Sequence, residues 1–272
     1  MKWDELTSRR LASVDRGSVC VLPLGAVEQH GPHLPLGTDA MIARALADRL
    51  DAACCDRLLV TPGPPCGCSD HHMGFPGTLT LRHETFLASV VETIGSMFGH
   101  GFRRFFLLNA HGGNGAIGGV ISERAARDWP EAEVVFATWF RVAADRLRPL
   151  VEGAYPAVGH ACEFETSLIL ALRPDLVDRD VIADDGLAPA SPLLHSDLLT
   201  GGVAVRAVPF ERITRSGVWG KPSLATAEKG EAILKITVSA LKDLLTAYWP
   251  DAPGIAGPGP AAVNGGVRSH AS

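Results

Sequence analysis

Two short segments carry side chains that can bind metal ions. Residues 25–40 and 109–114 hold the candidate ligands Glu28, His30, His33, Asp39 and His111. Glu28 and His30 are two positions apart, so in extended backbone they face the same side and an oxygen and a nitrogen can converge on one ion. A mixed set of carboxylates and imidazoles suits Zn²⁺, Mn²⁺ or Fe²⁺. These residues therefore predict metal-assisted chemistry.

With Asp39 and His111 added, the candidate ligands are enough to bind two metal ions. Asp39 lies at the predicted start of a helix, where a carboxylate gains from the helix dipole, and its two oxygens can bridge two cations. His111 comes from the end of another strand and makes a fourth ligand. Gly112 and Gly113 leave space for a substrate and a close approach of the backbone. A two-metal site would hold a bridging hydroxide and polarise a carbonyl, which is hydrolytic chemistry.

Each of these residues also has an ordinary structural role open to it. Glu28 can be a solvated loop acid, and Asp39 can be only a helix N-cap. His30 and His33 can be turn residues, and His111 can cap the helix that follows it. Position favours the metal interpretation, because three polar clusters stand where this class of fold places its binding sites.

Strands that alternate with helices must bring these clusters together. Short apolar runs predict buried strands at residues 18–24, 57–62, 103–110 and 132–140. Helical spacing follows at residues 38–50, 83–101, 115–129, 163–172 and 225–249. This order predicts an α/β fold, a single domain with a mostly parallel β-sheet sandwiched between helices. The candidate ligands then follow the carboxyl ends of the first and third strands.

The domain is expected to cover residues 1–249. Residues 250–272 are rich in Pro, Gly and Ala, and we expect a flexible tail there. Residues 177–220 show no regular pattern, which leaves a hairpin or a lid open.

Composition excludes several classes of function. The chain has 272 residues, a net charge of −5 and 46% hydrophobic residues, so it can form a large core but lacks the basic patch of a nucleic-acid partner. Its apolar runs are too short for a membrane span, and MKWDELTSRR is not a secretory signal. The six cysteines do not resemble a disulfide framework, which favours the cytoplasm. Cys66 and Cys68 alone are a weak soft-metal pair.

Five motifs, in this order, resemble the creatininase family of metal-dependent amidohydrolases. They are LPLGAVEQHGPHLPLGTDA, FPGTLTL, LLNAHGGN, GHACEFETSLILAL and KPSLATAEKGEAIL, and they span about residues 18–245. The resemblance implies a single α/β domain, a homohexamer and a small-molecule amide substrate. It also implies two divalent metal ions, zinc with zinc, manganese or iron.

Carried over position by position, the resemblance assigns roles to individual residues. Glu28, His30, Asp39 and His111 match the metal ligands of the family, with Asp39 as the bridge. Creatininase has a further glutamate ligand where this chain has Gly113. We assign that role to Glu165, with Glu163 as the alternative.

The remaining assignments concern catalysis and substrate. His160 matches a histidine near the substrate of creatininase and is expected to transfer or orient a proton, although it can also be a helix cap. Glu163 is the candidate base, and Glu165 takes that role if it is not a ligand. Three residues are expected to bind substrate, namely Gly112, Gly113 and Asn114. His33 is expected to orient a ligand from behind.

The expected reaction is hydrolysis of a cyclic amide or a formamide by metal-bound hydroxide, with His160 protonating the leaving nitrogen. Gly112 and, approximately, Pro156 stand where creatininase carries aromatic residues, which argues against creatinine as the substrate. Trp139 and Trp219 can supply other aromatic walls or belong to the core. Two alternatives stay open, a peptidase that trims a small peptide during cofactor maturation and a metal-binding relative without catalysis.

Overall fold

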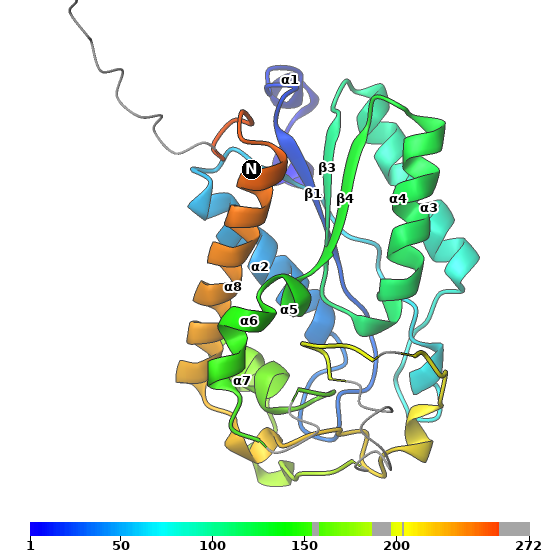
Figure 1. Ribbon diagram of the computed structural model, residues 1–272, viewed down its shortest axis with the longest axis vertical. Helices are drawn as coiled ribbons and strands as arrows, with labels where there is room; N and C mark the ends of the chain where they lie inside the picture. The colour runs from blue at the N-terminus through cyan, green and yellow to red at the C-terminus, as the bar shows by residue number, and fades with distance from the viewer. Residues whose placement is uncertain (154–157, 187–196, 203, 256–272) are drawn as a thin grey trace, which may run out of the picture.

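Four parallel strands form the sheet that carries the candidate ligands (Figure 1). The computed structural model describes residues 1–153, 158–186, 197–202 and 204–255. In the order in which they pair across the sheet, the strands are β2 (Leu59–Val60), β1 (Val19–Leu24), β3 (Arg104–Asn109) and β4 (Glu133–Thr138). The predicted α/β fold with a parallel sheet is confirmed.

Helices cover both faces of the sheet. One face packs against α2 (Thr38–Ala53), α7 (Glu163–Leu172) and α8 (Ala227–Tyr248). The other packs against α3 (His83–Gly99) and α4 (Gly115–Asp128). Along β1, Val19 and Val21 face the first layer, whereas Cys20 and Leu22 face the second. This burial on both faces explains why the strand is a continuous apolar run.

Shorter helices complete the described chain, namely α1 (Ser8–Ala12), α5 (Trp139–Val142) and α6 (Ala144–Leu147). The helix α5 begins where the sequence predicts the last residues of a strand. Trp139 and Phe140 are buried in the core in either conformation, so their hydrophobicity does not distinguish strand from helix. Trp139 is therefore a core residue and not an aromatic wall of the site.

The contact between α7 and α8 sets the position of the first turn of α7. A Cβ atom at Gly230 would lie 2.0 Å from the carbonyl oxygen of Ser167, so only glycine allows the two helices to approach this closely. Thr226 caps α8 through a hydrogen bond from the Lys229 amide to its hydroxyl, and its own amide donates to Ser167 Oγ at 3.1 Å. These contacts hold the turn that carries Glu163 and Glu165.

Core packing continues beyond residue 249, where we expected the domain to end. Ala252 and Ile255 are buried against the layer of α2 and α8. The expected tail from residue 256 onward lies outside the described residues. Within 177–220, the described part contains single-turn helices and isolated bridges, and residues 187–196 and 203 lie outside the description. Among the described residues, no helix is long and apolar enough to cross a membrane.

Candidate metal site

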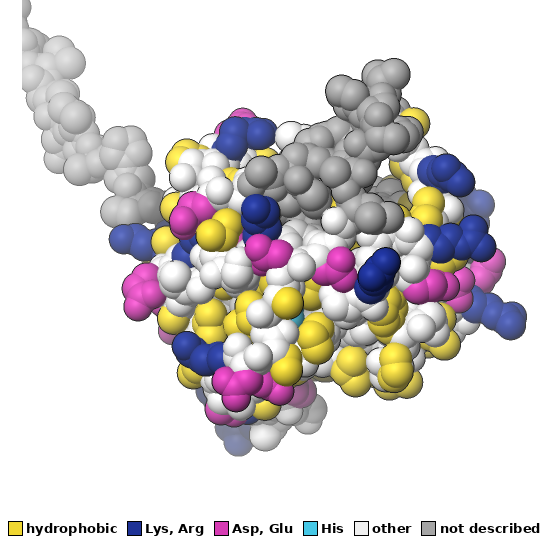
Figure 2. Space-filling model, turned by 90° about the horizontal axis from the view of Figure 1, so that it is seen from below, with side chains coloured by type: hydrophobic (Ala, Val, Ile, Leu, Met, Phe, Trp, Pro, Cys, Tyr) yellow, Lys and Arg dark blue, Asp and Glu magenta, His cyan; other side chains and the backbone are white. Residues whose placement is uncertain are grey.

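The candidate ligands meet beyond the carboxyl ends of β1 and β3. Glu28 and His30 lie in the loop after β1, and His111 directly follows β3. Asp39 lies in the first turn of α2, whose N-cap residue is Gly37 and not Asp39. All four side chains are buried. Figure 2, which views the molecule from below, shows very little histidine surface on this face.

Two histidines, when neutral, direct unprotonated nitrogens toward the two oxygens of Asp39. His30 Nδ1 lies 3.1 Å from the carbonyl oxygen of Glu28, and His111 Nε2 lies 3.0 Å from that of Cys68. A carbonyl oxygen only accepts, so these nitrogens carry the hydrogen of the neutral ring. The other nitrogens then face Asp39, with His30 Nε2 3.2 Å from Oδ1 and His111 Nδ1 2.9 Å from Oδ2.

This arrangement fits divalent metal ions. Lone pairs that face each other at about 3 Å repel unless a cation lies between them. Glu28 Oε2 is buried and accepts no hydrogen bond from any described residue. Histidines that donate their other N–H to a carbonyl are the usual form of metal-binding histidine. Glu28, His30 and Asp39 offer atoms within 4.8 Å of one another.

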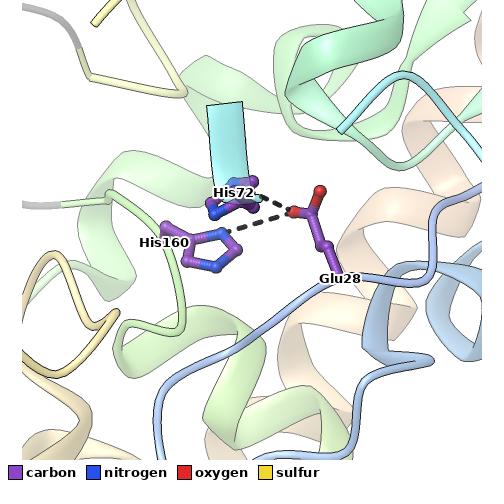
Figure 3. A group of neighbouring side chains, drawn as sticks. All are labelled: Glu28, His72 and His160. Atoms are coloured by element: carbon purple, nitrogen blue, oxygen red, sulfur yellow. Dashed lines mark ion pairs between the residues drawn. The ribbon is translucent and has the colours of Figure 1, made fainter. Parts of the chain in front are cut away.

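His160 lies in the loop before α7 and Glu165 lies in the first turn of α7, and both are close to these ligands. Glu165 Oε2 lies 4.0 Å from His30 Nε2 and accepts a hydrogen bond from the Ala161 amide. His160 Nε2 donates to the carbonyl oxygen of Gln29 at 2.6 Å, and its Nδ1 lies 3.7 Å from Glu28 Oε1 (Figure 3). His30, His160 and Glu165 form a further group within 4.8 Å.

The electrostatics of the cluster favour positive charge. Burial opposes protonation of His30, but Asp39 and Glu165 outweigh it and raise its pKa to about 9. Burial and the charge of Asp39 raise the pKa of Glu165 to about 7, against the opposite effect of His30. Against its burial, the pKa of His111 is also raised by Glu28 and Asp39, so without metal the carboxylates favour the protonated forms of His30 and His111. A divalent ion would take the place of those protons.

Two neighbouring histidines, His71 and His72, belong to the cluster and were missed from the sequence. They lie in the single turn η2 (Asp70–His72), and His72 Nε2 is 3.3 Å from Glu28 Oε1 (Figure 3). Thr78 of the FPGTLTL motif holds this turn, because its hydroxyl accepts from the Gln29 amide at 3.1 Å and donates to the His72 carbonyl at 3.3 Å. The pair of histidines just before that motif was the available signal.

Phe210 is a second residue that the sequence did not indicate. It lies in the single turn η8 (Phe210–Arg212), inside the irregular segment. Its ring centroid is 4.3 Å from that of His72 and 4.9 Å from that of His160. It therefore supplies an aromatic wall to the cluster. Trp219 instead pairs its backbone with that of His160, and Pro156 lies outside the described residues.

Glu163 does not join the cluster. Its Oε2 is 2.9 Å from Lys229 Nζ, and its Oε1 accepts from the amides of Glu152 and Gly153. Both oxygens are therefore occupied, and Oε2 forms an ion pair with a largely buried lysine. We therefore assign Glu163 to the stability of the α7–α8 contact and no longer to catalysis.

The other expected site residues lie around the ligands. His33 Nε2 is 2.8 Å from Thr166 Oγ1, and Thr166 directly follows Glu165 in α7. Asn114 is fully buried, and its side-chain amide bonds Gly25, Cys68 and Asn109, so it ties loops together. Gly112 is exposed and Gly113 is half-buried. Cys66 and Cys68 belong to none of the groups of potential metal ligands found among the described residues.

Comparisons with known proteins identify the family of this chain. The family model for creatininase, described as creatinine amidohydrolase, matches residues 1–245. A mycofactocin precursor peptide peptidase of Mycolicibacterium smegmatis is 32% identical over 92% of both chains. The creatinine amidohydrolase of Pseudomonas putida is 29% identical over 92% of this chain and 96% of its own.

Solved structures agree as well. The structure described as "Creatininase Mn" superimposes with a TM-score of 0.77 and 29% identity, over 92% of this chain and 98% of that one. The family model covers nearly the whole described chain, including every ligand candidate. The chain therefore belongs to the creatininase family of metal-dependent amidohydrolases.

Proposed function

We propose that this protein hydrolyses the carbon–nitrogen bond of a small cyclic amide or formamide with two divalent metal ions. The observation that carries the proposal is the position of Asp39 between His30 and His111, each of which turns a ring nitrogen, unprotonated in the neutral ring, toward a different carboxylate oxygen. One carboxylate can then bridge two ions. Relatives described with manganese and with two zinc ions support zinc with zinc, manganese or iron as the pair.

The proposed ligands are Glu28, His30, Asp39, His111 and Glu165. When bound, divalent ions activate water and polarise an amide carbonyl. Neutral histidines suit this role, since the N–H bonds of His30 and His111 to carbonyl oxygens fix each ring in one orientation. Glu165, whose pKa lies near 7, can ionise as an ion binds.

His160 is the proposed proton carrier. Its Nε2–H is held by the Gln29 carbonyl, and burial holds its pKa well below the usual value, so Nδ1 stays unprotonated and keeps a lone pair. Nδ1 faces Glu28 across 3.7 Å, at the edge of the proposed metal site. From there it can take a proton from the attacking water and pass it to the leaving nitrogen.

A peptide substrate is the second candidate. It is favoured by the relative named mycofactocin precursor peptide peptidase, at 32% identity over 92% of this chain. The exposed Gly112 also leaves this side of the site without the aromatic that would enclose a small flat ring. A third possibility, a metal-binding relative without catalysis, predicts bound ions and no turnover.

The test is a substrate panel with metal-loaded protein. Lactams, formamides and short peptides are assayed for release of amine or formate, with Asp39→Ala as the inactive control. Turnover of a lactam or formamide supports the main proposal, and turnover of peptides alone supports the second. If metal-loaded protein hydrolyses none of these substrates, both the amide proposal and the peptide proposal are wrong.

We further propose a cytoplasmic homohexamer as the working form, on the resemblance to the family and the unpaired cysteines. Light scattering on the purified protein measures its mass directly. A monomer would remove the hexamer from the proposal without changing the chemistry.

A further inference from the structure

The backbone at Gly113 leaves no room for a side chain, and the space beside it holds His71. A Cβ atom at Gly113 would lie 2.2 Å from the Cys68 carbonyl oxygen, 2.4 Å from His111 Nε2 and 2.9 Å from His71 Cε1. Any residue larger than glycine would displace the loop that carries His71. The glycine and the histidine therefore form one arrangement, in which an imidazole stands where a side chain from position 113 would project.

His71 is oriented for ligation. It offers a ring nitrogen within 4.8 Å of a Glu28 carboxylate oxygen and of a His111 nitrogen. Its ring is nearly parallel to that of His111, with an interplanar angle of 13° and centroids 5.8 Å apart. No hydrogen bond to His71 is found among the residues that the structure describes. A half-buried imidazole with both nitrogens free is available to an ion.

The adjacent His72, unlike His71, is held in one tautomer by a hydrogen bond. The Gln29 side chain accepts from the Gly31 amide through Oε1 at 2.9 Å and donates to the Gly217 carbonyl through Nε2 at 3.2 Å, which fixes its orientation. Gln29 Nε2 then donates to His72 Nδ1 at 2.8 Å. A neutral histidine that accepts at Nδ1 carries its hydrogen on Nε2.

His72 therefore points a hydrogen, and not a lone pair, at Glu28 Oε1 across 3.3 Å. A nitrogen that carries a hydrogen cannot bind a metal ion. His72 can hold Glu28 in position or donate to a substrate oxygen. The two neighbouring histidines are thus distinguished by their hydrogen bonds, although both approach the same carboxylate.

We propose that His71 is a metal ligand, together with Glu28 and His111, and that His72 is a hydrogen-bond donor to that site. This inference rests on the proposed two-metal function. It adds a nitrogen ligand to the proposed ligands, three of which are carboxylates. A ring nitrogen at this position favours zinc over manganese at the ion bound to Glu28, since imidazole suits zinc and carboxylates suit manganese.

The experiment compares metal binding by full-length variants stripped with a chelator and reloaded with Zn²⁺ or Co²⁺. Metal content is measured by mass spectrometry and affinity by competition with a chromogenic chelator. His71→Ala should weaken the binding of one of the two ions by about 100-fold. Losing a residue that only supports a ligand costs up to about that much, and losing a ligand should cost no less. The visible Co²⁺ spectrum should change with it. His71→Glu, which restores a ligand atom, should recover most of the affinity.

Two controls accompany His71→Ala. His72→Ala should keep both ions and weaken their binding less than His71→Ala does, while turnover falls, because it removes a hydrogen bond to a ligand and not a ligand itself. His83→Ala, at the exposed start of α3, should change neither. If His71→Ala folds poorly by circular dichroism, His71→Gln with and without added imidazole provides the same comparison, and imidazole should restore binding.

The failures are distinguishable. Wild-type affinity for both ions in His71→Ala and His71→Gln overturns the assignment of His71 and leaves the proposed hydrolase intact. Loss of an ion in His72→Ala but not in His71→Ala also overturns it, since it reverses the two roles. A wild-type protein that binds no divalent ion overturns the proposed function and this inference together.

Discussion

His111 Nδ1 lies 2.9 Å from Asp39 Oδ2, and neither atom carries a hydrogen while the ring is neutral. Two lone pairs at this distance need a cation between them. In the metal-free protein that cation is a proton, because the buried carboxylates raise the pKa of His111 well above its usual value despite its burial. The same geometry accepts a divalent ion once the proton leaves.

Replacing Asp39 by Asn should abolish binding of both ions. The change keeps the shape of the side chain but removes its charge and one acceptor oxygen, so the contacts to His30 and His111 no longer support a bridge. We expect kcat/KM to fall by about 10³-fold or more, which corresponds to about 4 kcal/mol of metal-assisted stabilisation. Elemental analysis provides the measurement. Two ions per chain in Asp39→Asn would contradict the bridging role.

Replacing Lys229 by Met should destabilise the protein by about 3–5 kcal/mol, because it leaves the buried carboxylate of Glu163 without its cation. Urea unfolding measures the change. Glu163→Gln in the same chain should recover part of the loss. Arg49→Met breaks an exposed pair with Glu231 and should cost less than about 1 kcal/mol. Equal losses in the two single variants would show that burial does not set the cost.

Replacing Phe210 by Ala should lower kcat/KM about tenfold and leave metal content unchanged. The ring packs on His72 and His160 and encloses the site, and tenfold corresponds to about 1.4 kcal/mol, within the range of one aromatic contact. Phe210→Leu, which keeps most of the volume, should retain most of the activity. If Phe210→Ala loses metal instead, the ring supports the ligands and does not face the substrate.

Asp185 should make stability depend on pH at the acidic end. Partial burial disfavours its charge, but hydrogen bonds from Ser216 and Thr214 outweigh that effect and hold its pKa well below the usual value. These bonds position the turn whose Gly217 carbonyl accepts from Gln29. The contribution is complete above about pH 4, the usual Asp pKa, and is lost as the pH falls through the folded pKa.

Asp185→Asn measures that contribution. At pH 7 it should lower the free energy of unfolding by about 1–2 kcal/mol, allowing for solvent screening at this partly exposed carboxylate. The gap between wild type and variant in urea should narrow as the pH is lowered toward 2. A gap that stays constant from pH 7 to pH 2 would show that the ionised carboxylate is not what stabilises the turn.

The sequence determined the layered fold and four of the candidate ligands. Continuous apolar runs identify strands buried on both faces, and the polar residues that directly follow them must lie at one edge of a parallel sheet. Glu28, His30 and His111 could therefore be placed together before any coordinates, with Asp39 at the start of the next helix. These assignments depend on local position along the chain.

The tertiary structure decided which side chains complete the site. Glu163 and Glu165 are two positions apart in α7, so the helical rotation of about 100° per residue sends them to opposite faces, and only packing against α8 shows that Glu163 faces Lys229. His71 and His72 are neighbours in one helical turn, and their position in that turn does not show which of them can bind an ion. The contacts of Gln29 and the missing side chain at Gly113 distinguish them, and those contacts join segments far apart in the sequence.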